Sequence, residues 1–196
     1  MDLYYSKPSP YARKARVAAA ELGISDRIRL VEIDPRDPAT GFWKLNPLGK
    51  IPALVIDQDT IMFDSPVICE YLDQAVGDGR LLPAERCWRI RTLVALADGI
   101  LDAGMAVRLE RVRPENEQSP AWIDKQLATV GRGLDGLQDV LPELHHRVDL
   151  ASIAAGCAIG WILHRHAYQD WLGPRPELAA WYETFAARDS MRQTAP

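Results

Sequence analysis

The sequence predicts a small α/β domain followed by an all-α domain, and three observations support this prediction. Apolar runs with strand-like spacing lie before residue 64, and helical segments separate them. A cluster of turn residues at 77–83 marks a change in composition. Beyond it, apolar residues recur every three or four positions and no convincing strand is evident. We therefore expect one domain over 1–78, a linker over 79–86 and a helical domain over 87–196.

The α/β part is expected to follow the order β-α-β and then β-β-α. Its strands are predicted at 3–5, 28–33, 53–56 and 60–63, and a hairpin connection joins the last two. Its helices are predicted at 11–22 and 66–75, with a loop and a short helix over 34–45.

The spacing of apolar residues also predicts which side chains these two helices bury. In the first helix alanines form one face, whereas Arg13 and Lys14 lie on other faces. In the second helix the residues expected to point inward are Val67, Ile68, Tyr71 and Leu72.

The second half of the chain is predicted to be helical throughout. Helices are expected over 87–113, 122–141, 150–165 and 177–187. The segment 131–136 matches G-x-G-x-x-G, but it lies inside a helix and no strand precedes it. We therefore reject a dinucleotide site there and expect the glycines to allow close helix packing.

The composition is that of an ordinary globular protein and argues against several classes. Hydrophobic residues make up 47% and charged residues 26% of the chain, and the net charge of −4 does not favour nucleic acid or an anionic membrane. The most apolar stretch, 150–163, is shorter than the roughly 20 residues of a membrane span. No signal peptide is evident, so a cytoplasmic protein is expected.

Neither the cysteines nor the histidines predict a metal site. The three cysteines form no C-x-x-C pair, and Cys69 and Cys157 are expected in the core. The pairs His145 with His146 and His164 with His166 are poorly spaced for one metal ion. We expect solvated or capping histidines and no metal.

Two short segments carry the strongest functional signal. Residues 45–54 place a turn just before Lys50 and the Ile51-Pro52 bond, and X-Pro is the bond that is held cis at a modest cost of about 0.5–1 kcal/mol. Residues 63–66 are typical of a strand end and a helix start, with Asp64 or Ser65 as the cap. The free N–H groups of such a helix start suit a carboxylate.

Together these segments resemble the glutathione-binding half of the glutathione S-transferase family. In that family an N-P-x-G-x-(I/V)-P segment carries a cis-proline, and an acidic residue followed by serine holds the γ-glutamyl end of glutathione. The resemblance covers most of the chain. It implies a thioredoxin-like N-terminal domain, a helical C-terminal domain, a homodimer and glutathione as co-substrate.

The resemblance also implies a role for each residue of the two segments. Lys50 would pair with the glycyl carboxylate, the alternative being a plain solvated charge, and Ile51 would hydrogen-bond the cysteinyl backbone beside Pro52. Ser65 would hold the γ-glutamyl carboxylate and Asp64 the α-amino group. Relatives more often carry Glu or Gln at the position of Asp64.

Ser9 lies between the first strand and the first helix. On its own, Ser9 followed by Pro10 is typical of a helix N-cap. In the tau, theta and zeta kinds of the family a serine in this loop hydrogen-bonds the glutathione sulfur. Ser9 resembles that serine, and Ser6 is the alternative. A hydroxyl that donates to S⁻ at the positive end of a helix favours the thiolate, which is the nucleophile.

The resemblance bears as well on the start of the helix at 150–165. Relatives usually begin this helix with a serine or threonine cap and an aspartate three residues later, whereas here Asp149 and Ser152 exchange these types. Aspartate caps as well as serine does, so the helix is expected to form. The reciprocal contact of a long acidic side chain is expected to be lost.

The function implied is that of a glutathione transferase that detoxifies a small hydrophobic electrophile or a peroxide with a serine-activated thiolate. The electrophile is expected between the domains, against the long helix at Met105, Arg108 and Leu109 and against Trp161. Asp98 is a candidate to reach the γ-glutamyl amine across a dimer. Conjugation, peroxide reduction and dehalogenation are all open. The alternative is a non-catalytic binding or regulatory protein, like the stringent starvation proteins that bind RNA polymerase.

Overall fold

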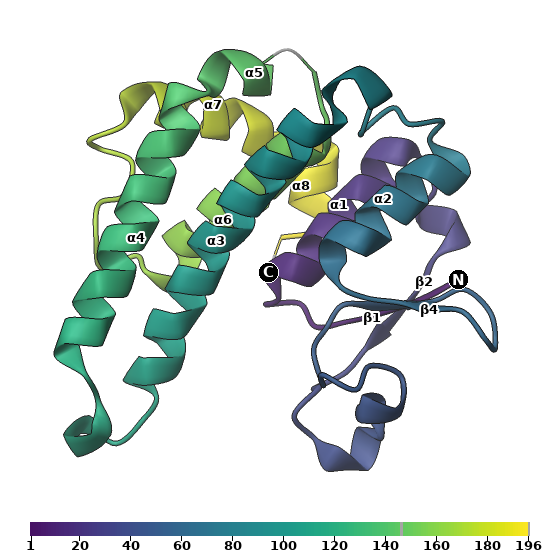
Figure 1. Cartoon of the computed structure of the whole chain (residues 1–196), viewed down its shortest axis with the longest axis horizontal. Coiled ribbons are helices and arrows are strands. Elements are labelled where there is room, and N and C mark those ends of the chain that lie inside the picture. Colours follow the sequence, from purple (N-terminus) through teal and green to yellow (C-terminus); the bar gives the residue numbers. More distant parts are fainter. Residues whose placement is uncertain (146, 196) are drawn as a thin grey trace. The chain divides into compact units, whose positions relative to one another are not determined.

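Two compact units make up the chain in the computed structural model, which describes residues 1–145 and 147–195 (Figure 1). The first unit holds residues 1–87 together with 188–195, and the second holds 88–187. The first contains a sheet and helices and the second only helices among its described residues, so the predicted fold class is confirmed. The predicted domain boundaries stay a prediction, and they did not include the return of 188–195 to the first unit.

A four-stranded mixed sheet forms the centre of the first unit. The strands are β1 (Asp2–Tyr5), β2 (Arg29–Glu32), β3 (Ala53–Val55) and β4 (Ile61–Met62), in the spatial order β2-β1-β3-β4. β1 runs parallel to β2 and antiparallel to β3, and β3 runs antiparallel to β4. All four are strands that the sequence predicts: β1 begins one residue earlier than expected, and the other three are shorter by one residue at one or both ends.

Helices α1 (Pro10–Leu22) and α2 (Ser65–Val76) lie side by side against this sheet (Figure 1). α1 ends at Gly23, whose φ of 73° is the left-handed conformation that glycine adopts most easily at a helix C-terminus. The segment between β2 and β3 contains two short 3₁₀ helices, Pro38–Thr40 and Phe42–Lys44. The Phe42 ring packs on Tyr4 of β1, with 5.8 Å between ring centroids.

Burial on α1 differs from the prediction, because Arg13 and Lys14 are both buried. The reason for Arg13 is helix α8 (Asp189–Gln193), which the sequence analysis did not predict and which packs on α1. Arg13 Nη2 donates to the carbonyl oxygen of Met191 at 2.9 Å, and its Nε lies 3.4 Å from Thr194 Oγ1. A buried cation is tolerated where such partners satisfy its N–H groups.

Burial on α2 also differs at one position. Val67 was expected to point inward but is 48% exposed. The buried side of the helix instead runs through Ser65, Ile68, Cys69 and Leu72. Positions three and four residues apart share a helix face, and Val67 falls outside that series. The expectation that Cys69 lies in the core is confirmed.

The second unit is a set of packed helices. They are α3 (Cys87–Arg111), α4 (Pro120–Asp139), α5 (Leu141–His145), α6 (Leu150–Arg165) and α7 (Pro176–Ala186). This unit also contains the 3₁₀ helix Glu115–Glu117, and the first unit contains two further ones, Ser25–Arg27 and Ala84–Arg86. α6 is buried over residues 150–162 and forms the core that the sequence predicts. Within the described ranges, every helix is too short or too polar to cross a bilayer.

Asp149 caps α6 as predicted, but the expected loss of the reciprocal contact is wrong. Asp149 Oδ1 accepts from the Ser152 backbone N–H at 3.0 Å, and Ser152 Oγ accepts from the Asp149 N–H at the same distance. The serine hydroxyl is long enough to reach back from the third helical position, so a complete capping box forms with the two residue types exchanged.

The sequence predicts that the glycines of α4 allow close helix packing, and the structure confirms this at Gly133. A Cβ on Gly133 would lie 2.4 Å from Ile100 Cγ1 of α3, so only glycine fits there. A Cβ on Gly136 would meet Leu96 at an ordinary 3.5 Å. The motif therefore serves helix packing at Gly133.

Candidate functional site

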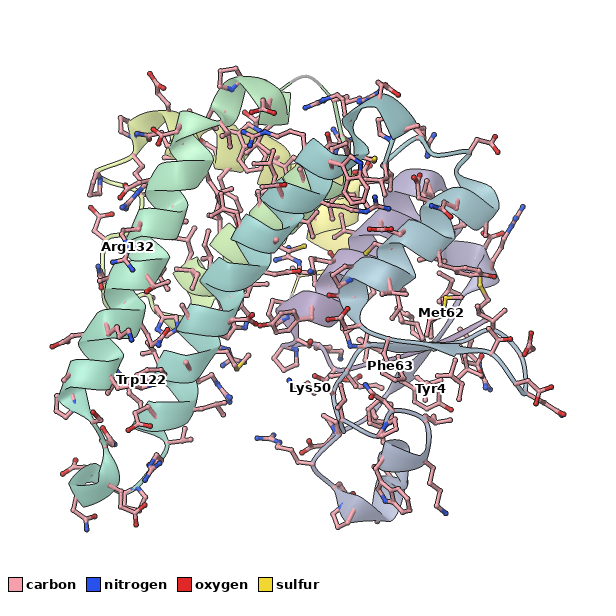
Figure 2. The ribbon with its side chains drawn as sticks, in the orientation of Figure 1. Tyr4, Lys50, Met62, Phe63, Trp122 and Arg132 are labelled. Carbon is pink, nitrogen blue, oxygen red and sulfur yellow. The ribbon has the colours of Figure 1, made fainter. Side chains whose placement is uncertain are left out.

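The candidate site of the first unit is one end of the sheet. Tyr4 pairs with Ala53, and Leu54 pairs with Met62. Continuing these registers by one residue brings the end of β1, the start of β3 and the end of β4 to the same edge. The chain runs from these ends into α1 and α2, so the N-termini of both helices lie there. Figure 2 shows Lys50, Phe63 and Tyr4 in this part of the unit.

Ser9 is the N-cap residue of α1 and is half-buried. Its Oγ accepts a hydrogen bond from the backbone N–H of Ala12 at 3.2 Å. A serine hydroxyl has one hydrogen to donate besides its acceptor lone pairs. The capping contact therefore leaves the Ser9 O–H free to donate, at the positive end of the α1 dipole.

The loop before β3 is built around Asn46, which is 1% exposed. Its Nδ2 donates to the Lys50 carbonyl oxygen at 2.6 Å and its Oδ1 accepts from the Leu48 N–H at 3.0 Å. Gly49 closes the turn with a φ of 60°, and its N–H donates to the Asn46 carbonyl oxygen. One buried amide thus orients the chain that enters the Ile51-Pro52 bond.

The Ile51-Pro52 peptide is cis, as the motif predicts. Pro52 is buried, whereas Lys50 is exposed. Among the described residues, the N–H and C=O of Ile51 form no hydrogen bond with another backbone group. These two groups are therefore available to a molecule with a peptide backbone, in the manner of an added strand.

Helix α2 begins at Ser65, which is 1% exposed. Asp64, one of the two predicted caps, occupies the N-cap position, but its side chain makes no capping hydrogen bond. Within the part of the chain that the structure describes, the exposed Asp64 carboxylate has no partner. The preceding Phe63-Asp64 peptide is also cis. The helix start thus offers free N–H groups to an anion and a carboxylate to a cation.

These groups form a complementary set for a small zwitterionic peptide. The two helix N-termini and Lys50 attract carboxylates, and Asp64 attracts an ammonium group. The backbone of Ile51 matches an extended backbone, and the Ser9 hydroxyl can donate to a soft anion such as a thiolate. Sequence reasoning named these residues but missed Asn46, which it treated only as part of a turn; the Asx-turn pattern at 46–49 is the signal that could have found it.

The residues expected around the electrophile belong to the second unit. Met105 and Arg108 are half-buried on α3, and Leu109 is exposed. Trp161 of α6 is 2% exposed, and a Cβ on Gly104 of α3 would meet its ring. Trp161 therefore lies in the core behind α3, and its expected direct contact with the electrophile is not supported.

The sequence predicted solvated or capping histidines, and His166 is the C-cap residue of α6 but is buried rather than solvated. Its Nε2 lies 3.0 Å from the Gly104 carbonyl oxygen, and its Nδ1 lies 2.9 Å from Tyr168 Oη. Because a carbonyl only accepts, Nε2 carries the hydrogen, and Nδ1 accepts from the tyrosine when the ring is neutral. Burial lowers the pKa of His166. The hydrogen bond to Gly104 raises this pKa and the charge of Arg111 lowers it, and the net result is a lowered pKa.

Among the described residues, no group of three or more His, Cys, Asp or Glu side chains is arranged to hold a metal ion. His145 and His164 are exposed. His146, which the sequence analysis paired with His145, lies outside the described residues.

Two family models match the chain, one in each unit. The glutathione S-transferase N-terminal domain matches residues 8–75, and the glutathione S-transferase C-terminal domain matches 120–184. The first match spans Ser9, the Ile51-Pro52 bond and Asp64 with Ser65, which are the groups that meet at the sheet end.

Relatives match over the whole length. The GST-like protein YibF of Escherichia coli K12 is 34% identical over 100% of this chain and 98% of its own. A glutathione transferase family member from Pseudomonas fluorescens Pf-5, solved with bound glutathione, is 38% identical with a TM-score of 0.95 over 100% of this chain and 98% of its own. It was also solved with bound S-(propanoic acid)-glutathione.

A more partial relative is the stringent starvation protein A homolog of Pasteurella multocida, which is 33% identical over 59% of each chain. The family models together cover more than half of the sequence, and the matches to YibF and to the Pseudomonas structure extend over all of it. The chain belongs to the glutathione S-transferase family.

Proposed function

We propose that this chain binds glutathione at the sheet end of its first unit and activates the thiol for attack on a small electrophile. The observation that carries the proposal is the meeting of Ser9, the Ile51 backbone and the α2 N-terminus at one edge of the sheet. Bound glutathione in the Pseudomonas fluorescens relative supports the choice of ligand. Its complex with S-(propanoic acid)-glutathione supports a site that also accepts a substituent on sulfur.

The proposed roles follow the charges of glutathione. The γ-glutamyl carboxylate takes the free N–H groups and hydroxyl of Ser65, and the α-amino group pairs with Asp64. The cysteinyl backbone pairs with the Ile51 backbone beside Pro52, and the glycyl carboxylate pairs with Lys50. The sulfur then accepts from Ser9. Met105, Arg108 and Leu109 contribute to the electrophile site, with Trp161 supporting α3 from behind.

Activation by Ser9 is a matter of thiol pKa. A free thiol has a pKa near 8.5 and is mostly protonated at neutral pH. Lowering that pKa by about two units takes roughly 2.7 kcal/mol of preference for the thiolate. A charge-assisted hydrogen bond supplies roughly 1.5–3 kcal/mol, and a helix N-terminus adds about 0.3–1 kcal/mol. The Ser9 hydroxyl at the start of α1 can therefore supply a preference for the thiolate of the required size.

The test compares Ser9→Ala with Ser9→Thr and Ser6→Ala. Calorimetry measures glutathione affinity, and ultraviolet absorbance of the thiolate across pH measures the pKa of the bound thiol. We expect Ser9→Ala to raise that pKa by about one to two units and to lower conjugation roughly 10–100-fold, with affinity nearly unchanged. Ser9→Thr keeps a hydroxyl and is expected to keep most of the activation.

Two results would count against this assignment. An unshifted thiol pKa in the wild-type complex would leave a glutathione-binding protein without activation. A loss of activation in Ser6→Ala but not in Ser9→Ala would move the role to Ser6. Stability of every variant is checked first, because removing the Ser9 cap is itself expected to cost about 1 kcal/mol.

A second candidate is a non-catalytic binding or regulatory protein, and the match to a stringent starvation protein A homolog favours it. In that case the purified protein would lower no thiol pKa and would carry a stoichiometric protein partner.

We further propose a cytoplasmic homodimer, as the family resemblance implies. Light scattering of the purified protein tests the dimer: a mass of one chain at micromolar concentration would refute it.

A further inference from the structure

We propose that the second unit holds a separate site for a small aliphatic diamine, in a cavity between the end of α4, helix α5 and helix α7. The inference goes beyond the proposed function, because it uses residues of the second unit alone and none of the groups assigned to glutathione. It is carried by a cavity of suitable size and, among the described residues, by two carboxylates without partners and one buried amide oxygen without a donor.

The cavity has a volume of about 740 Å³ and lies where α7 packs on both α4 and α5 (Figure 1). Sites for small molecules typically measure roughly 300–1,000 Å³ and combine apolar walls with a few polar groups. The apolar part of this lining comes from Leu141, Pro142, Ala180 and Trp181. The methylene chain of an organic ligand would replace water against these side chains, which favours binding.

Two carboxylates line the cavity, those of Asp139 and Glu177. Both residues are exposed, and within the described part of the chain neither side chain forms an ion pair or a hydrogen bond. The nearby Asp135, in contrast, is paired with Arg175 at 2.6 Å. Among the described residues of the lining none is a lysine or an arginine. The cavity therefore carries two uncompensated negative charges and attracts a ligand with positive ones.

The ends of two helices place these carboxylates. Asp139 is the last residue of α4, and the last turn of this helix has no basic side chain. The carbonyl groups at a helix C-terminus carry partial negative charge, so a cation is favoured beside Asp139. Glu177 is the second residue of α7. Because the carboxylates belong to different helices, a ligand needs an ammonium group at each end to pair with both.

Gln138 gives the third observation. Its side chain lines the same cavity, and its Oε1 is buried and accepts no hydrogen bond from any described residue. A buried acceptor without a donor is costly, and such atoms are normally satisfied by protein, water or ligand. The amide turns readily about its terminal torsion, so its oxygen can be presented to a donor in the cavity. An ammonium group has three N–H donors and no acceptor, which suits this oxygen.

Calorimetry at low salt tests the proposal with 1,4-diaminobutane, 1,6-diaminohexane and 1,8-diaminooctane, because the spacing of the ammonium groups decides which diamine fits. The matched probes with fewer charges are 1-aminohexane and hexane-1,6-diol. We expect the best diamine to bind about three- to ten-fold more tightly than 1-aminohexane, since an exposed ion pair contributes a modest free energy, and the diol to bind least. His145 also lines the cavity, so the titrations are made at pH 8, where imidazole is neutral.

Variants locate the binding site. Asp139→Asn and Glu177→Gln each remove one carboxylate, and each is expected to lower the diamine affinity about three- to ten-fold, toward that of 1-aminohexane. Gln138→Met removes the acceptor at similar side-chain size and is expected to weaken the binding of the amines as well. The matched control is Glu183→Gln. Glu183 is an exposed carboxylate of α7 that is not among the residues lining the cavity, so this variant loses the same charge and should bind the diamine as wild type does.

Several results would overturn the inference. They are equal affinities of wild type for the diamines and the diol, no diamine binding at millimolar concentration, an unchanged diamine affinity in Asp139→Asn or Glu177→Gln, and the same loss in Glu183→Gln. Melting temperatures of the free variants are compared first, because a carboxylate in the first turn of α7 also stabilises that helix. The comparison of ligands on wild type needs no variant. Glutathione enters none of these measurements, so their outcome is independent of the proposed function.

Discussion

At the scale of single residues, Ser9 combines two tasks in one hydroxyl. The oxygen caps α1 by accepting from Ala12, and the hydrogen is left for an external acceptor. The residue type that makes a good N-cap is therefore also the type that the proposed thiol chemistry needs. This explains why the sequence pattern alone could not distinguish a cap from a thiolate donor: both readings describe the same side chain.

Asn46 gives a prediction at the same scale. Asn46→Asp keeps the oxygen that accepts from Leu48 but replaces the donor to the Lys50 carbonyl by a second acceptor. We expect a loss of roughly 1–3 kcal/mol of stability, because a buried polar group loses its partner. We also expect weaker glutathione binding, since the Lys50–Ile51 backbone loses its support. Thermal unfolding and calorimetry measure the two effects, and unchanged glutathione affinity would show that Asn46 does not position this backbone.

His166 predicts how stability depends on pH. Its pKa is lowered in the folded protein, by burial first and by Arg111 second, so below pH about 6.5 the unfolded chain binds a proton that the folded chain does not. Stability is therefore expected to fall as pH falls from about 6.5, by at most about 1.4 kcal/mol per pH unit. His166→Gln is expected to flatten the melting temperature between pH 5 and 6.5. The exposed His164→Gln is the control, and equal slopes in both variants would contradict the assignment.

At the scale of elements, the two glycines of α4 form a matched pair. Gly133→Ala would push a methyl group into Ile100, and overpacking of this kind costs about 1–3 kcal/mol. Gly136→Ala meets Leu96 at an ordinary distance and gains up to about 1 kcal/mol of helix propensity. Denaturant unfolding should shift the two variants in opposite directions. Equal shifts would mean that α3 and α4 adjust to the added methyl group.

The strands and most of the longer helices were predictable from the sequence, whereas α8 and some side-chain directions were not. Apolar periodicity and caps locate α1, α2, α3 and α6 within one or two residues, because these signals are local. Val67 was misplaced because several apolar residues follow one another in α2, and the true buried face depends on what packs there. Arg13 was misplaced because its partners lie 178 and 181 residues away, beyond any local pattern.

The candidate site also has features that the sequence could predict and features that it could not. The cis Ile51-Pro52 bond and the helix start at Ser65 follow from motifs of a few residues. Their meeting with Ser9 depends on strand pairing across the sheet, which sequence spacing does not determine.

At the scale of the whole molecule, the first unit is made of two separate stretches of chain. Deleting residues 188–196 would remove the partners of buried Arg13 and the ion pair between Arg188 and Glu21, 2.8 Å apart. We expect a loss of roughly 2–4 kcal/mol, chiefly because a buried guanidinium is left without acceptors. Hydrogen exchange of α1 amides measures the loss within the first unit. Adding Arg13→Met to the shortened chain should recover part of it, and no recovery would mean that Arg13 is not the cause.

The return of residues 188–195 also sets an order of events during synthesis. About 100 residues, the whole second unit, are translated between Cys87 and Arg188. At about 5–20 residues per second this takes on the order of ten seconds. During that interval the nascent first unit lacks α8, and water has to accept the hydrogen bonds of the Arg13 guanidinium in place of the Met191 carbonyl. The first unit, whose synthesis begins before that of the second, is thus the last to be completed.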